Sequence, residues 1–235
     1  MKVSLVIPVW NEIIGMREIM PKVKREWVDQ ILFIDGGSTD GTIEYLKEHG
    51  YEYIVQKGPG LRNAYLEAMP LVRGDVLLTF SPDGNSIPEK IPECITKMKE
   101  GDYDMVIVSR YYGGAKSQDD DIITGFGNWM FRTMINVCHR AHYTDPMVIY
   151  RAFKKKIIYD LELDRPHWYA REERWFNTNL SWEPLMAIRC AKRKLKVAEI
   201  GGDEPPRIGG VRKLQIIAWG ASFVYQTIRE MFVWR

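Results

Sequence analysis

The chain has 235 residues, of which 46% are hydrophobic and 27% are charged, and its formal net charge is +2. This length fits one globular α/β domain with a sizeable core. The small net charge gives no reason to expect a nucleic-acid partner, which normally requires a dense basic face. The three cysteines are widely spaced and lack a Cys-x-x-Cys pair. They disfavour a disulfide framework and a zinc site, and they fit a reducing, cytoplasmic location.

Short apolar runs alternate with amphipathic segments of helical length over the first 110 residues. The expected strands are 3–7, 31–34, 53–55, 76–80 and 105–108, and the expected helices are 13–26, 40–49, 60–69 and 88–100. This alternation predicts an α/β fold with a mostly parallel central sheet flanked by helices. After residue 110 the alternation ends, and an aromatic-rich helix is expected at 123–138. Because no linker rich in Pro, Gly or Ser interrupts the chain, we expect a single domain over residues 1–235.

Polar residues follow the expected strands at their carboxyl ends, where such sheets usually bind their ligands. The first strand is followed by Pro8, Asn11 and Glu12, and the second by Asp35–Thr42 (DGGSTDGT). Asp35 is a candidate to accept hydrogen bonds from a base or a ribose, because the glycines beside it let the backbone approach a ligand. The same segment is also compatible with an ordinary strand-to-helix turn that carries a capping aspartate.

Asp83 and Asn85 follow the fourth expected strand. Their alternate spacing predicts that both side chains point the same way. A carboxylate and an amide oxygen are suitable ligands for Mg²⁺ or Mn²⁺ held together with a diphosphate. We therefore predict a divalent metal cofactor bound by Asp83 and Asn85. The alternative is a simple Asp-Gly turn without a ligand.

The segment Arg207–Lys213 (RIGGVRK) places three cations around a pair of glycines. Guanidinium and ammonium groups on such a loop can close on phosphates. The alternative is a solvated basic loop, which is common on protein surfaces.

Taken in order, these segments resemble the family-2 glycosyltransferases with a GT-A fold, and most closely the dolichyl- or polyprenyl-phosphate mannosyltransferase-like branch. Residues 6–12 (VIPVWNE) resemble the opening Pro-x-x-Asn-Glu of the family, and residues 35–42 resemble Asp-Asp-Gly-Ser-x-Asp-Gly-Thr. Residues 109–111 match a Ser-Arg-Tyr turn, and residues 145–153 (DPMVIYRAF) are similar to Asp-Pro-Thr-Ser-Gly-Phe-Arg-Ala-Phe. Residues 207–213 are similar to Arg-x-x-Gly-x-Ser-Lys.

The resemblance implies inverting transfer of a sugar from a nucleoside-diphosphate sugar to an acceptor such as a polyprenyl phosphate. It implies a nucleotide-sugar-binding half (1–110), an acceptor half with a phosphate-binding loop (111–213) and a C-terminal amphipathic helix (214–235). Asp83 is the first expected catalytic residue, and Arg110 and Arg151 are expected to bind acceptor or donor phosphate. The expected donor-binding residues are Pro8, Asn11, Glu12, Asp35, Asp83, Arg207 and Lys213.

Three departures from the family pattern leave alternatives open. Ser81 replaces the first acidic residue of the family's Asp-x-Asp motif, and Gly36 replaces the second aspartate of the earlier motif. Residues 147–149 replace Thr-Ser-Gly, which leaves the acceptor open. A catalytically silent nucleotide-sugar-binding protein is therefore an alternative. A nucleotidyltransferase is disfavoured because the chain lacks an early Gly-x-Gly-x-x followed by Arg and Lys.

Glu183 is a second candidate catalytic residue. A sugar hydroxyl acceptor requires a carboxylate that takes its proton, whereas a phosphate acceptor requires no base. Hydroxyl-using relatives carry a Glu-Asp pair at the start of a helix, where this chain has Glu183-Pro184. The alternative is that both residues simply suit the first turn of a helix. Transfer to a glycan hydroxyl is thus the alternative to a polyprenyl phosphate acceptor.

The C-terminal segment Leu214–Trp234 is the most apolar stretch of helical length. If it spanned a bilayer, Gln226, Arg229 and Glu230 would be buried at depth, and each central charge would cost at least ~2.5 kcal/mol. Together with the aromatic-rich stretch at 126–137, the segment predicts peripheral contact with the inner face of the membrane. The residues expected at the lipid boundary are Trp219, Phe223, Phe232 and Trp234. The alternative is that the helix packs on its own sheet or on a second subunit.

Overall fold

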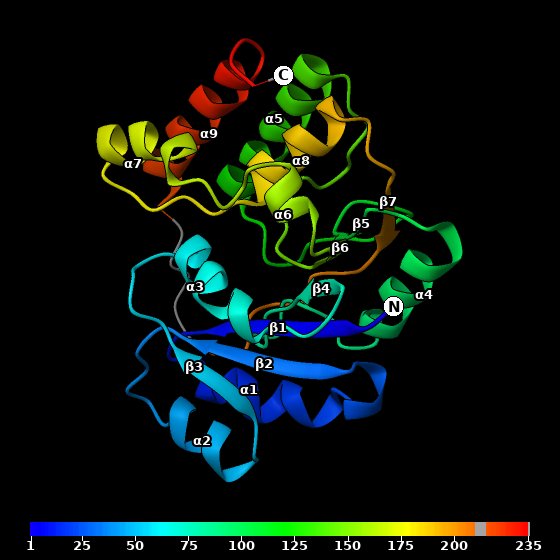
Figure 1. The fold of residues 1–235 in the computed structure, drawn as a ribbon, viewed down its shortest axis with the longest axis vertical. Helices are drawn as coiled ribbons and strands as arrows, with labels where there is room; N and C mark the ends of the chain where they lie inside the picture. Colours follow the sequence, from blue (N-terminus) through cyan, green and yellow to red (C-terminus); the bar gives the residue numbers. More distant parts are fainter. Residues whose placement is uncertain (210–214, 235) are drawn as a thin grey trace.

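The computed structural model describes residues 1–209 and 215–234 (Figure 1). The strands are β1 (Val3–Val9), β2 (Gln30–Asp35), β3 (Glu52–Val55), β4 (Val76–Thr79), β5 (Met105–Ser109), β6 (Arg151–Lys154) and β7 (Val197–Gly201). The α-helices are α1 (Ile13–Ile19), α2 (Thr42–Glu48), α3 (Leu61–Ala68), α4 (Lys90–Gly101), α5 (Ile122–His139), α6 (Ile157–Asp160), α7 (Ala170–Phe176), α8 (Glu183–Lys192) and α9 (Ile216–Glu230). Short 3₁₀ turns follow α1 and α3, and one precedes α7.

All seven strands form one sheet in the order β3-β2-β1-β4-β6-β5-β7. Only β6 runs antiparallel to its neighbours, which are β4 and β5. The prediction of an α/β fold with a mostly parallel sheet is confirmed. Strands β6 and β7 were not expected from the sequence, and both come from the second half of the chain. The two halves therefore share one sheet.

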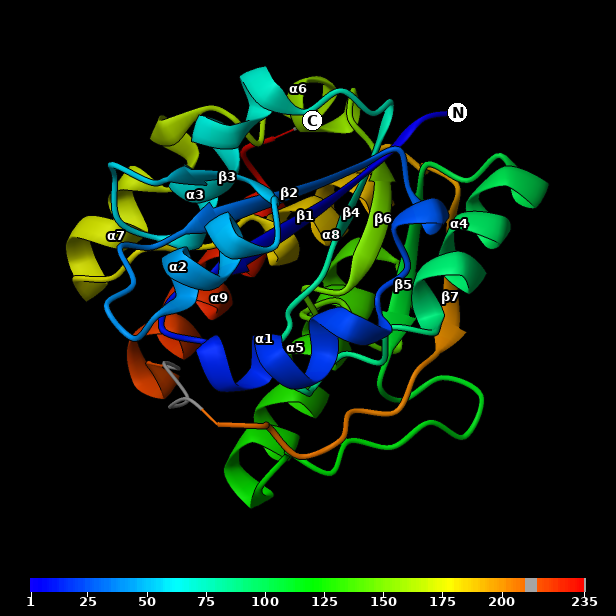
Figure 2. The same cartoon turned by 90° about the horizontal axis from the view of Figure 1, so that it is seen from below.

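Each face of the sheet is covered by helices and forms its own apolar core. Leu5 and Ile7 of β1 point to the core under α1, α2 and α4, whereas Val6 points to the opposite core. The view from below shows the first set of helices (Figure 2). The opposite core includes Tyr65 of α3 and Phe223 of α9. This burial on both faces explains why the strand sequences are almost continuously apolar.

Helix α9 lies along one side of the molecule and buries only one of its faces, while residues such as Ile217 stay exposed. It contacts α5, α7 and α8, and its Glu230 forms a fully buried ion pair with Arg189 of α8 at 3.1 Å. Phe223 and Trp234, which we expected at a lipid boundary, are both buried. That part of the expectation is wrong, because these aromatic rings fill the core between the helices. Within residues 1–209 and 215–234, no helix is both long and apolar enough to cross a membrane.

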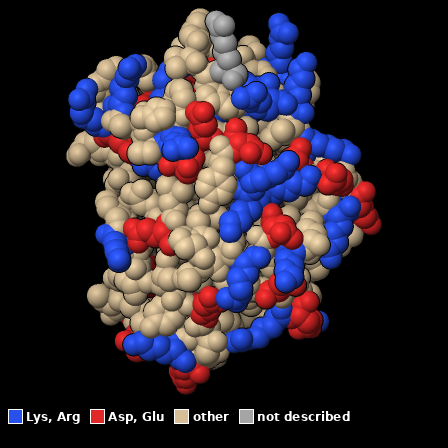
Figure 3. All heavy atoms as spheres, viewed as in Figure 1, with Lys and Arg blue, Asp and Glu red and all other residues tan. Residues whose placement is uncertain are grey.

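Charges of both signs lie on the face of the molecule seen in Figure 1. In the space-filling view, Lys and Arg side chains are interspersed with Asp and Glu side chains over the face seen in Figure 1 (Figure 3). By contrast, a few buried charged side chains, among them Asp35 and Asp83, lie at or beyond the carboxyl ends of the parallel strands. That edge is the candidate site.

Candidate functional site

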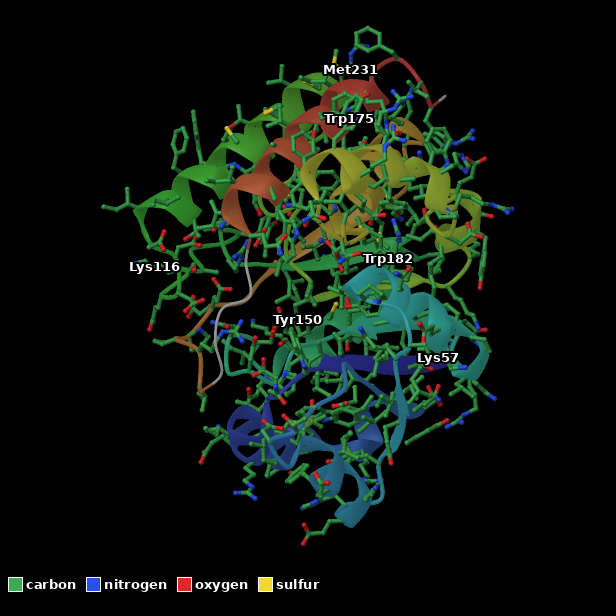
Figure 4. The ribbon with its side chains drawn as sticks, turned by 90° about the vertical axis from the view of Figure 1, so that its left-hand side faces the viewer. Lys57, Lys116, Tyr150, Trp175, Trp182 and Met231 are labelled. Carbon is green, nitrogen blue, oxygen red and sulfur yellow. The ribbon has the colours of Figure 1, made fainter. Side chains whose placement is uncertain are left out.

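The carboxyl ends of strands β1, β2 and β4 lie side by side and face the viewer in Figure 4. We call this row of strand ends the edge of the site. Strand β1 lies between the other two, and all three are parallel. The loops that follow them are therefore neighbours, although they are separated by up to 70 residues in the sequence. These loops carry Glu12, Asp35 and Asp83.

The loops after β1 and β2 are tied together by hydrogen bonds. The backbone N–H of Asn11 donates to Ser38 Oγ at 2.8 Å, and Asn11 Oδ1 accepts from the Thr39 N–H at 2.8 Å. The N–H of Ile13 donates to Asp40 Oδ2 at 3.0 Å, which fixes the start of α1. Asn11 has a φ of 54°, a left-handed conformation that asparagine tolerates better than most residues. Asn11 thus shapes the edge of the site in addition to any contact with a ligand.

Asp35 is fully buried at the end of β2. Its Oδ1 accepts hydrogen bonds from the N–H groups of Gly37 and Ser38, both at 2.8 Å. Its Oδ2 is buried and has no hydrogen-bond partner among the described residues. A buried carboxylate oxygen without a partner is costly, and a ligand hydroxyl or N–H would satisfy it. The geometry fits the predicted role of Asp35 in binding a base or a ribose.

The side chain of Trp10 explains one departure from the family pattern. A Cβ atom at Gly36 would lie only 3.0 Å from Trp10 Cβ and 3.1 Å from its Cγ. Real Cβ atoms rarely approach other atoms so closely, so a larger residue at position 36 would have to displace the indole. Glycine at this position therefore makes room for tryptophan on the neighbouring loop.

Asp83, Glu12 and Arg207 form the charged centre of the edge. Arg207 Nη2 lies 2.8 Å from Asp83 Oδ2, and Arg207 Nη1 lies 3.6 Å from Glu12 Oε1. Asp83 is 5% exposed and Glu12 is nearly as buried. We predicted all three residues as donor ligands, but we did not predict that they contact each other. Only the fold could show this, because Arg207 follows Asp83 by more than a hundred residues.

The Asp83 and Asn85 side chains both contact the segment around residues 205–207, but strand spacing is not the reason. Strand β4 ends at Thr79, and residues 82–85 form a turn, so the alternation of a strand does not apply to them. The side-chain amide of Asn85 donates to the Pro205 carbonyl at 2.9 Å, and its backbone N–H donates to Asp83 Oδ1 at 3.1 Å. In this structure Asn85 fixes the turn to the segment before Arg207.

The segment 205–209 packs closely over the turn and α1. The N–H of Ile208 donates to the Asp83 carbonyl at 2.7 Å. Gly84 has a φ of 92°, and a Cβ there would lie 2.6 Å from Ile208 Cγ1. A Cβ at Gly15 of α1 would lie 2.5 Å from the Pro82 carbonyl oxygen and 3.2 Å from that of Ile208. Glycine is needed at both positions for the backbone segments to meet.

Arg110, a predicted phosphate ligand, already has carboxylate partners. Its Nε lies 2.6 Å from Asp145 Oδ2 and its Nη2 lies 2.9 Å from Asp145 Oδ1, which is a bidentate pair. Glu204 lies 3.4 Å from its Nη1. Burial alone would lower the pKa of Arg110, but the charge and hydrogen bonds of Asp145 and the nearby charge of Glu204 together outweigh burial and raise the pKa well above the usual range. A phosphate at this position would have to compete with two carboxylates.

Arg151 does not face an open site in this structure. It is fully buried in β6, and its guanidinium donates to the carbonyls of Val148 at 2.9 Å and Pro146 at 3.0 Å. It also donates to the Glu183 carbonyl at 3.4 Å, and burial lowers its pKa. We correct the assignment of Arg151 as a phosphate ligand, because its donors hold the preceding loop and the start of α8.

Glu183 is the first residue of α8 and is 2% exposed. Its Oε1 is buried without a hydrogen-bond partner in the part of the chain that the structure describes. Burial raises the pKa of its carboxyl. The adjacent Trp182, which lies between the two halves in Figure 4, stacks on Tyr65 with ring centroids 4.8 Å apart. A raised pKa suits a general base, but here the carboxyl is enclosed by protein.

Two further expectations concern the metal and the basic loop. Among residues 1–209 and 215–234, no cluster of three or more His, Cys, Asp or Glu side chains could hold a metal ion. Asp83 and Glu12 could supply two carboxylates, and a diphosphate would have to supply further oxygens. Lys213 lies outside the described residues.

Residues 4–161 match the family model of glycosyl transferase family 2. The chain belongs to this family, as the motifs at its strand ends indicated. It is 27% identical over 212 residues to the glycosyltransferase AglJ of Haloferax volcanii, covering 88% of this chain and 64% of that protein. It is 28% identical over 183 residues to the dolichol-phosphate mannosyltransferase of Pyrococcus furiosus, covering 70% of this chain and 49% of that protein.

Solved structures show the same fold. The glucosyl-3-phosphoglycerate synthase of Mycobacterium tuberculosis, solved with Mn²⁺, uridine diphosphate and phosphoglyceric acid, superposes with a TM-score of 0.67 at 16% sequence identity. The match covers 99% of this chain and 79% of that one. The predicted GT-A type fold is confirmed.

The close packing of Gly15 leads to a first prediction. Gly15→Ala should lower the free energy of unfolding by ~1–3 kcal/mol, because the new methyl group pushes against the Pro82 carbonyl. Gly125→Ala is the matched control, since a Cβ at this α5 glycine lies 4.0 Å from its nearest neighbour. Alanine there should instead raise the free energy of unfolding by up to ~1 kcal/mol. Urea unfolding measures both, and equal stability of the two variants would contradict the packing argument.

Proposed function

We propose that this chain transfers a sugar from a nucleoside-diphosphate sugar to a phosphate acceptor, with inversion at the anomeric carbon. The observation that carries the proposal is the cluster of Asp83, Glu12 and Arg207 beside the buried Asp35, at the strand ends of a family-2 fold. Residues 1–110 would bind the donor, and residues 111–213 would form most of the acceptor side.

A divalent metal fits this cluster. Asp83 and Glu12 already enclose a cationic group, the Arg207 guanidinium, and carboxylate oxygens are the ligands that Mg²⁺ and Mn²⁺ prefer. Asn85 is a proposed further ligand only if its amide leaves Pro205. A bound metal would neutralise charge on the departing diphosphate. Asp35 would orient the nucleoside through its buried Oδ2.

In this scheme the arginine and the acceptor have distinct tasks. The Arg207 guanidinium can donate to diphosphate oxygens and stabilise the charge that develops on them. The proposed role of Pro8 is to place the β1 loop beside the donor. An acceptor phosphate oxygen attacks the anomeric carbon, so the bond to the diphosphate breaks as the new bond forms, and no proton has to be removed.

We propose a polyprenyl phosphate as the acceptor. The Pyrococcus relative is a dolichol-phosphate mannosyltransferase, and dolichol phosphate is a polyprenyl phosphate. The enclosure of Glu183 also supports an acceptor that requires no base, because a sugar hydroxyl would have to reach a carboxyl that is 2% exposed. Arg110 is the proposed acceptor-phosphate ligand if it can exchange one of its carboxylate partners.

A lipid acceptor requires access to a membrane, and α5 offers an apolar face for it. Ile122, Phe126 and Trp129 are 92%, 61% and 53% exposed, and they follow the spacing of one helical stripe. Val137 continues the stripe and is exposed as well. Exposed aromatic and aliphatic side chains on one helix face are typical of helices that lie in a membrane interface. We therefore propose that α5, rather than the buried face of α9, makes the peripheral contact.

The enzymatic proposal is tested by a panel of nucleotide sugars assayed with and without polyprenyl phosphate. We expect release of nucleoside diphosphate that depends on the lipid phosphate, and we expect Asp83→Asn to lower it at least about a hundredfold. Asp102→Asn is the matched control, because Asp102 pairs with Lys154 on the surface and asparagine tolerates its left-handed φ of 45°. Donor binding without turnover for every donor would instead support a silent binding protein.

Liposome flotation tests the membrane contact. The double variant Phe126→Gln and Trp129→Gln should partition at least about tenfold less to vesicles of phosphatidylcholine and phosphatidylglycerol, because each ring loses its apolar contact. The double variant Val55→Gln and Leu71→Gln is the control, since both residues are exposed apolar side chains on the donor half. Equal flotation of the folded wild-type protein and both double variants would reject the contact through α5.

A further inference from the structure

The Arg207 guanidinium lies where a metal bound to Asp83 and Glu12 would have to lie. It contacts Asp83 Oδ2 at 2.8 Å and comes within 3.6 Å of Glu12 Oε1. The Arg207 side chain is only 25% exposed, and both carboxylates are more buried than it is. A divalent cation and a guanidinium cannot occupy the same position between two carboxylates. One of them must leave before the other binds.

The backbone on both sides of Arg207 is held in place. The Pro205 carbonyl accepts from the Asn85 amide at 2.9 Å, and the Ile208 N–H donates to the Asp83 carbonyl at 2.7 Å. Ile208 also packs against Gly84 so closely that a methyl group would not fit between them. The segment can therefore stay on the turn while only the long side chain of Arg207 moves. A side-chain rotation of this kind needs no rearrangement of the sheet.

A nucleoside diphosphate would give Arg207 another anionic partner. Its phosphate oxygens form strong charge-assisted hydrogen bonds with a guanidinium, as carboxylates do. When the diphosphate arrives beside Asp83, the guanidinium can move to it and free the carboxylate for the metal. Without the diphosphate, a metal ion would have to displace Arg207 and leave its charge partly buried without a partner, which is costly.

We propose that Arg207 makes metal binding depend on the nucleotide. Without nucleotide, the Arg207 guanidinium lies between the carboxylates of Asp83 and Glu12 and blocks the metal. When a nucleoside diphosphate binds, the guanidinium moves away and the metal can bind. The proposal rests on the proposed donor site and adds a binding order to it. By thermodynamic linkage, the nucleotide must then raise the affinity for metal, and the metal must raise the affinity for nucleotide by the same factor.

The test measures binding of Mn²⁺ alone, by the electron paramagnetic resonance signal of free Mn²⁺, with the full-length protein. Arg207→Met removes the guanidinium but keeps most of the apolar stem, and it should raise the affinity for Mn²⁺ about tenfold or more in the absence of nucleotide. Arg207→Lys keeps a positive charge and should stay closer to the wild type. Adding Asp83→Asn to Arg207→Met should abolish the gain.

Arg73→Met is the matched control for the loss of a positive charge. Arg73 Nη2 lies 2.8 Å from Glu52 Oε2 in an exposed ion pair. The variant removes the same charge as Arg207→Met, but the contact between Arg207 and Asp83 stays in place. It should bind Mn²⁺ like the wild type. A similar gain in this variant would show a general charge effect and overturn the proposal, as would an unchanged or weaker affinity in folded Arg207→Met.

Repeating the titrations with uridine or guanosine diphosphate separates this proposal from the donor site itself. We expect one of the two nucleotides to raise the affinity of the wild type for Mn²⁺ by a larger factor than that of Arg207→Met. If neither nucleotide binds to either protein, the donor site is wrong. If a nucleotide binds both proteins but raises their Mn²⁺ affinities by equal factors, the donor site stands and the role of Arg207 is refuted.

Discussion

The ion pair between Asp83 and Arg207 joins two parts of the chain that are distant in sequence, and the geometry of the site depends on it. Asp83 follows β4 in the first half of the chain, and Arg207 follows β7 near its end. The pair forms only because β6 and β7 complete the sheet that the first half begins. The close contacts at Gly15 and Gly84 then hold the segment of Arg207 against the turn of Asp83. The ion pair and these packing contacts together couple the donor edge to the rest of the fold.

Buried charge also organises the acceptor half, but there it serves the structure. Arg151 holds backbone carbonyls, Arg110 is paired with Asp145, and Arg189 is paired with Glu230. A buried charge needs such partners because removing it from water is costly. An arginine in a family motif can therefore have all its hydrogen-bond donors paired with protein groups. Whether it also binds a ligand depends on which partners can exchange, and Arg207 is the most exposed of these guanidiniums.

The sequence predicted the fold class and the edge of the site, because both depend on local patterns. Apolar runs of strand length defined β1 to β5, and the polar residues after them marked the ligand edge. The direction and partners of β6 could not be predicted. Most of its residues belong to the segment 145–153, which we had taken for a family motif, and they pair with strands that are far away in the sequence. The contact of the Asn85 amide with the Pro205 carbonyl could not be predicted for a similar reason, because the two residues are 120 positions apart in the sequence. Phe223 and Trp234 were misplaced because an amphipathic pattern does not tell whether protein or lipid covers its apolar face.

The central claim is that Asp83 and Arg207 form the donor site and exchange partners when the donor binds. A crystal structure of the protein with Mn²⁺ and a nucleoside diphosphate, with anomalous diffraction to locate the metal, tests it most directly. We expect Mn²⁺ bound to Asp83 and to the diphosphate, with Arg207 moved from the carboxylate to a phosphate oxygen. Nucleotide and Mn²⁺ bound elsewhere, with the pair between Asp83 and Arg207 intact, would contradict it.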